Sequence, residues 1–140
     1  MRGGAIFQTI IPSLKVHICS LFPPTSPERK WMPVYVHSKL MIINDVFTTH
    51  GSANINTRSM QVDSEMNIAH DWASVTKALR QRLWKLHTNG IGMQDVPKLA
   101  FDTWQDILDE NKILEDTTKN APKASLILFN YNKPILKDQD

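Results

Sequence analysis

The chain has 140 residues, 16 basic and 14 acidic side chains, a net charge of +2, and 41% hydrophobic residues. This length and composition predict one folded domain with a core and exclude wholesale disorder. The balanced charge does not favour a nucleic-acid partner, and the single cysteine, Cys19, excludes an internal disulfide and a cysteine-rich zinc site. We find no signal peptide and no transmembrane segment in the sequence, so the compartment stays open.

The first fifty residues predict a strand, a proline-rich loop and a hairpin. Side chains alternate over residues 15–21, which predicts a short strand. Four prolines between residues 22 and 33 exclude a helix and a central strand there. Residues 34–50 predict a hairpin, because apolar runs lie on both sides of the turn-forming pair Asn44-Asp45.

After the hairpin, Gly51 permits a sharp exit from the strand, and Ser52 or Asn54 can cap a helical turn. A short strand is expected at residues 66–69. Asp71 is the predicted N-cap of a helix that ends at Asn89-Gly90.

The remaining residues predict one more helix and one more strand. The helix begins at Pro97 and runs toward Glu115, and a strand or buried tail is expected at residues 125–129. The predicted fold class is α/β, with a mixed β-sheet flanked by helices. The predicted organisation is one partial domain over residues 1–140, with a motif segment 34–69, a helical part 71–118 and a tail 119–140.

The pair His37 and Lys39 is the first candidate for chemistry. Residues two apart in an extended segment project to the same side, so an imidazole and an ammonium are expected together, with Ser38 opposite. Such a pair suits a phosphate, because one group can attack or carry a proton while the other stabilises negative charge. Taken by itself, however, a His-x-Lys spacing is common and also fits two unrelated surface residues.

The longer string resembles the phospholipase D superfamily. The family pattern is His-x-Lys-x4-Asp-x6-Gly-Ser with an asparagine shortly after, and residues 36–43 and 51–60 match its two parts with the expected gap. Asp63-Ser64-Glu65 extends the match. The Arg-Ser and Ser-Glu extensions are closer to phospholipases D than to cardiolipin synthases or nucleases.

The resemblance implies a role for each matching residue. His37 would be one of two catalytic histidines, of which one attacks phosphorus and the other protonates the leaving alkoxide and then activates water. Lys39 and Asn54 would bind phosphoryl oxygens, Ser52 would add a hydrogen bond, and Glu65 would orient the histidine. No metal or other cofactor is expected, because lysines and asparagines supply the charge stabilisation.

One further residue is a candidate by position alone. His50 precedes Gly51, which places it close to the expected site as a possible substrate contact.

Two features depart from the family pattern. Asn44 occupies the aspartate position, and Asp45 is not expected to replace it, because a slip of one residue turns a strand side chain to the other face. The chain also carries one His-x-Lys motif, whereas the family's site lies between two. Single-motif members of the family place a β-α-β-α-β unit ahead of the motif, and a βαβ unit alone needs about 30 or more residues. Only 36 residues precede His37 here, and they include the proline-rich loop and one predicted strand, so we expect the front of the domain to be missing.

These observations predict the C-terminal part of a two-motif phospholipase D. Its substrate would be a glycerophospholipid at a membrane surface, and its partner a missing N-terminal half or a second copy of the chain. A homodimeric nuclease of the same superfamily and an inactive fragment or interaction half-domain remain alternatives. Nucleic acid is not favoured, because the net charge does not support a basic groove.

Overall fold

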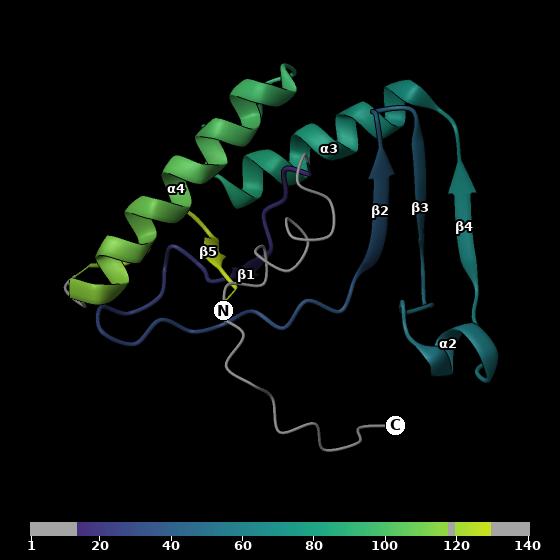
Figure 1. The fold of residues 1–140 in the computed structure, drawn as a ribbon, viewed down its shortest axis with the longest axis horizontal. Helices are drawn as coiled ribbons and strands as arrows, with labels where there is room; N and C mark the ends of the chain where they lie inside the picture. The colour runs from purple at the N-terminus through teal and green to yellow at the C-terminus, as the bar shows by residue number, and fades with distance from the viewer. Residues whose placement is uncertain (1–13, 118–119, 130–140) are drawn as a thin grey trace. The chain divides into compact units, whose positions relative to one another are not determined.

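A computed structural model describes residues 14–117 and 120–129 (Figure 1). Contacts divide the chain into two compact units. One combines the segment before residue 36 with the segment after residue 83, and the other is formed by residues 36–83.

The first unit has an apolar core built on a two-stranded sheet. Strand β1 (Cys19–Leu21) pairs antiparallel with β5 (Leu126–Leu128), and helix α4 (Pro97–Thr117) packs against β5. The core cluster consists of Ile107, Leu108, Ala124 and Leu126. Asn111 is also buried there. Its side-chain amide donates to the carbonyls of Ala124 and Leu126 at 2.8 and 2.7 Å, so this polar group is satisfied.

The second unit contains a three-stranded antiparallel sheet in the order β2–β3–β4. The strands are β2 (Lys39–Ile43), β3 (Phe47–Gly51) and β4 (Asn67–His70). Helix α2 (Thr57–Gln61) connects β3 to β4 at the end of the sheet where β2 begins (Figure 1). Helix α3 (Ala73–His87) follows β4, and its last four residues belong to the first unit.

The turn between β2 and β3 is joined to α3 by an ion pair. Asn44 and Asp45 have φ angles of +50° and +57°, in the left-handed region that Asn and Asp tolerate better than most residues. The Asp45 carboxylate accepts two hydrogen bonds from the buried Arg80 guanidinium, at 2.5 and 2.8 Å. A second contact ties α3 to β3, where the buried hydroxyls of Thr48 and Thr76 lie 2.8 Å apart.

The predicted α/β fold class is confirmed, and the described strand pairs run antiparallel in two separate sheets. The hairpin turn at Asn44-Asp45 is confirmed, as are the strands near 66–69 and 125–129. The helix that starts at Pro97 is also found. The preceding helix ends before Asn89 (φ +53°) and Gly90 (φ +86°), as its glycine stop predicts.

Several predicted boundaries were wrong. The strand expected at 15–21 is assigned only from Cys19, and Val34 forms a bridge with Leu21 and does not extend the hairpin. The reason is a contact with a residue 13 positions earlier in the chain, since the Val34 N–H donates to the Leu21 carbonyl at 2.8 Å.

The predicted helix caps also differ from the observed ones. Asn56, and neither Ser52 nor Asn54, caps α2, by accepting the Ser59 N–H at 2.8 Å. Helix α3 begins at Ala73, two residues after Asp71.

Some predictions fall outside the described residues. Residue 118 ends the predicted helical part and is not described, and neither are residues 119 and 130–140 of the predicted tail or residues 1–13 at the front of the chain. Within the described ranges, no helix has both the length and the apolar character that a membrane crossing requires.

Candidate functional site

Lys39 and His37 lie in contact at the start of β2. The Lys39 ammonium is 2.9 Å from Nε2 and 3.1 Å from Nδ1 of His37, and it donates to the His37 carbonyl at 2.9 Å. The prediction that these two side chains project together is therefore confirmed.

Gly51 lies at the centre of the sheet end that carries Lys39. It pairs with Lys39 of β2 and with Asn67 of β4. A Cβ atom at Gly51 would lie 2.0 Å from Asn67 Oδ1 and 2.2 Å from the Met66 carbonyl oxygen, so no side chain fits. Glycine is thus required here by the close approach of the neighbouring strand.

Ser52 continues this close pairing beyond the strand. Its N–H donates to the Met66 carbonyl at 3.0 Å, and its hydroxyl accepts the Met66 N–H at 3.1 Å. These two bonds fix Ser52 beside the segment that carries Glu65.

Glu65 is an ionised carboxylate at this end of the sheet. Hydrogen bonds from the Ser52 and Ser59 side chains lower the pKa of Glu65, and the positive charges of Lys39 and Arg58 lower it further. The structure therefore brings Glu65 close to Ser52 and into the electrostatic field of Lys39.

Lys39 and Asn54 line one hollow of about 330 Å³, which we call the Lys39 hollow. Asn67 lines it too, and apolar residues complete the wall, among them Met41, Ile55 and Met60. The hollow thus combines one ammonium and two side-chain amides with an apolar surface, a combination that suits an anionic group attached to an apolar one.

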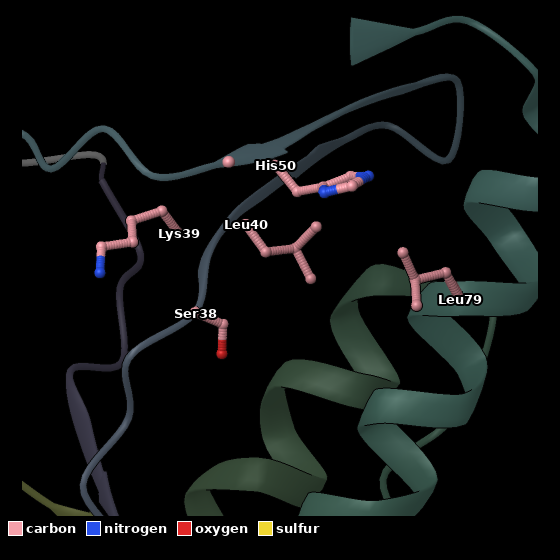
Figure 2. Close-up of a pocket in the computed structure, with 6 residues that line it drawn as sticks. Ser38, Lys39, Leu40, His50 and Leu79 are labelled. Atoms are coloured by element: carbon pink, nitrogen blue, oxygen red, sulfur yellow. The ribbon is translucent and has the colours of Figure 1, made fainter. Parts of the chain in front are cut away.

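His50 lies on the other face of the sheet. It pairs with Leu40, whose side chain alternates with those of Lys39 and Met41. Figure 2 shows His50 and Leu40 pointing toward Leu79, while the Lys39 side chain points the other way. These residues border a second hollow of about 450 Å³, which Ser38, Lys39 and Gly51 also line. Because the structure does not bring His50 to the Lys39 hollow, we leave it out of the proposed site.

Two residues gained a role only from the structure. Asn67 was interpreted as part of a short strand, yet its side chain borders the Lys39 hollow. The sequence signal that could have identified Asn67 is a polar residue within an otherwise apolar predicted strand. Asp45 was not expected to replace the missing motif aspartate, but its carboxylate is the group that binds Arg80 at this turn.

Among residues 14–117 and 120–129, no group of three or more His, Cys, Asp or Glu side chains could hold a metal ion.

Comparisons with known proteins give the family. The family described as "Cardiolipin synthase, PLD-like domain" matches residues 13–87, which is more than half of the chain. The chain belongs to the phospholipase D superfamily. The matched range contains every predicted site residue, from His37 to Glu65.

Curated phospholipases D are similar to parts of this superfamily member. Phospholipase D alpha 4 of Arabidopsis thaliana is 44% identical over 96 residues, covering 64% of this chain and 12% of the relative. Phospholipase D C of Dictyostelium discoideum is 26% identical over 134 residues, covering 74% of this chain and 8% of the relative. The chain thus spans about an eighth or less of the length of these two relatives. No solved structure matches it.

Proposed function

We propose that this chain supplies one half of the active site of a phosphodiesterase that cleaves or exchanges the head group of glycerophospholipids. The observation that carries the proposal is the contact of His37 with Lys39 beside a hollow that Lys39 shares with Asn54. The relatives that are named phospholipase D support the choice of a phospholipid, presented at a membrane surface, as the substrate.

In the proposed reaction, a histidine nitrogen attacks phosphorus, a P–N bond forms, and the P–O bond to the head-group alkoxide breaks. A second histidine donates the proton that the alkoxide takes up. That histidine then removes a proton from water or an alcohol, which attacks phosphorus and releases the first histidine. His37 is one of the two histidines. Lys39 and Asn54 stabilise the negative charge on the phosphoryl oxygens, and Ser52 adds a hydrogen bond.

Glu65 is proposed as the acid that orients the histidine. Its lowered pKa keeps it ionised at neutral pH, and it lies in the field of Lys39, next to the hydroxyl of Ser52. A carboxylate in this position stabilises an imidazolium when His37 takes up a proton.

The second histidine is proposed to come from an N-terminal half of a longer protein or from a second copy of the chain. The sequence carries one His-x-Lys motif, so His37 needs a partner. The unit that carries it exposes large apolar side chains, including Met41 at 47% and Phe47 at 36%, which another chain or domain can cover.

The experiment measures head-group release from mixed phospholipid vesicles by the chain alone and by the chain with an N-terminal phospholipase D half supplied in trans. His37→Ala and Lys39→Ala should each lower the rate about 10²–10⁴-fold. His50→Ala is the matched control, because His50 lies on the opposite face of the sheet, and it should leave the rate unchanged.

Acid quenching with phosphorus-labelled lipid then separates the two roles of His37. Label retained on the chain identifies His37 as the nucleophile, and label retained only on the supplied half identifies it as the acid–base. Full activity in His37→Ala would contradict the proposal. So would inactivity of the wild-type chain both alone and with the supplied half.

A further inference from the structure

We propose that Asn67 is a further substrate-binding residue, whose side-chain amide donates a hydrogen bond to an oxygen of the phosphodiester held by Lys39. The inference deepens the proposed function and rests on it.

The register of the sheet places Lys39 and Asn67 on one face. Lys39, Gly51 and Asn67 are direct cross-strand partners on β2, β3 and β4, so Lys39 and Asn67 flank Gly51 on the same face. Gly51 has no side chain, and a Cβ atom there would lie 2.0 Å from Asn67 Oδ1. The Asn67 side chain therefore takes the place over the middle strand that a side chain at position 51 would fill, on the face that carries Lys39.

A hydrogen bond from the backbone fixes the orientation of the Asn67 amide. Asn67 Oδ1 accepts the Ala53 N–H at 3.3 Å, and a backbone N–H can pair only with the oxygen of an amide. This bond leaves the Nδ2 group, with its two N–H donors, to face other partners. Asn67 is exposed and borders the same hollow as Lys39 and Asn54. Its Nδ2 group is therefore proposed to donate to an anion held in that hollow.

The charges around the hollow favour an additional neutral donor. Lys39 is the cation of the hollow, and the nearby Glu65 carboxylate offsets part of its positive charge. An amide donor carries no net charge that the Glu65 carboxylate could offset, so it can still donate a hydrogen bond to a phosphoryl oxygen. Asn67 would thus act together with Asn54 as a neutral donor, and Lys39 would supply the charge.

The test measures binding of dimethyl phosphate, a phosphodiester with no lipid chain and no head group, to the full chain labelled with ¹⁵N. Titration shifts of the backbone amides of Lys39 and Asn54 give the dissociation constant. Asn67→Asp keeps an oxygen for the Ala53 N–H and keeps the side-chain volume, but replaces the donor with a carboxylate.

Asn67→Asp should weaken binding about tenfold or more. The matched control is Asn56→Asp, which adds the same charge to the same unit at a residue that caps α2, where aspartate also caps well. It should change binding by less than about twofold. Asn67→Ser, which removes the amide without adding charge, serves if the aspartate variant does not fold, and it should also weaken binding.

Three results would overturn the inference. Unchanged binding in the Asn67 variants together with loss of binding in Lys39→Ala would remove Asn67 from the site but leave the proposed function standing. An equal loss in Asn67→Asp and Asn56→Asp would show a general charge effect. Absence of shifts at Lys39 and Asn54 in the wild-type chain would contradict both the inference and the proposed function.

Discussion

The two units differ in what they bury. Among the described residues, every buried large apolar side chain belongs to the unit formed before residue 36 and after residue 83, whereas the buried residues of the unit 36–83 are polar. Ile107, Leu108 and Leu126 represent the first group. The second group is Thr48, Ser59, Thr76 and Arg80. The first unit is thus stabilised mainly by removing apolar surface from water, and the second by hydrogen bonds and an ion pair.

This difference concerns function, because the unit with the polar interior, residues 36–83, carries the proposed site. Its strands expose apolar side chains on the face that holds Lys39, among them Met41 at 47% and Ile43 at 44%. A sheet that buries polar groups against its own helix and exposes apolar groups is suited to being covered by a partner. The comparison therefore supports the proposal that another half or another copy completes the site.

The largest expected effect tests the apolar side of the comparison. Ile107→Ala removes a side chain that is 1% exposed and should lower the free energy of unfolding by about 4 kcal/mol. Met41→Ala, at an exposed position of the other unit, should change it by less than about 0.5 kcal/mol. Urea denaturation followed by circular dichroism measures both. Equal losses would show that Met41 is covered in solution.

The next effect concerns the ion pair at the hairpin turn. Arg80→Met leaves the Asp45 carboxylate without its bidentate partner and should cost about 3 kcal/mol, the low end for a buried pair, because Asp45 is 30% exposed. Arg82→Met, at an exposed residue of the same helix, is the control in the same denaturation experiment. A loss below about 0.5 kcal/mol for Arg80→Met would mean that the turn does not depend on α3.

A smaller effect is expected at the buried hydroxyl pair. Thr48→Val leaves the Thr76 hydroxyl buried without its partner and should cost about 1–3 kcal/mol. The double change Thr48→Val with Thr76→Val should cost less than the sum of the two single changes, since it leaves no unsatisfied hydroxyl. Strict additivity in the double-mutant cycle would contradict this role of the bond.

Asn44 tests whether the departure from the motif matters. Asn44→Asp, in an active context with both site halves, should leave turnover within about tenfold, a barrier change below about 1.4 kcal/mol. The structure supports this expectation, because Asp45 already supplies the carboxylate that binds Arg80 and Asp tolerates the positive φ of position 44. A thousandfold gain would show that Asn44 disables the site.

The smallest expected effect is a pH dependence from Glu65. Its pKa is lowered from 4.5 in the folded chain, so its contribution to stability is fully present above pH 4.5 and is lost as the pH falls through the folded pKa. The difference in free energy of unfolding between the wild type and Glu65→Gln should therefore be smaller at pH 3 than at pH 6. The same difference at both pH values, measured by urea denaturation, would contradict the lowered pKa.

Much of the local structure could be predicted from neighbouring residues. Asn44-Asp45 predicted the turn, Asn89-Gly90 predicted the end of α3, and Pro97 predicted the start of α4. The predicted start of the hairpin at residue 34 was wrong, because the Val34 N–H pairs with Leu21, 13 positions away in the chain. Local pattern carries no information on such a partner.

The sequence by itself determined the family motif and the shared direction of His37 and Lys39, because a two-residue period and a fixed spacing are local properties. Only the tertiary structure decided that Asn67 enters the Lys39 hollow, that His50 faces away from it, and that Arg80 binds Asp45. Each of these depends on strand register or on a contact between residues far apart in the chain, and a shift of one residue in register would reverse the face on which a strand side chain lies.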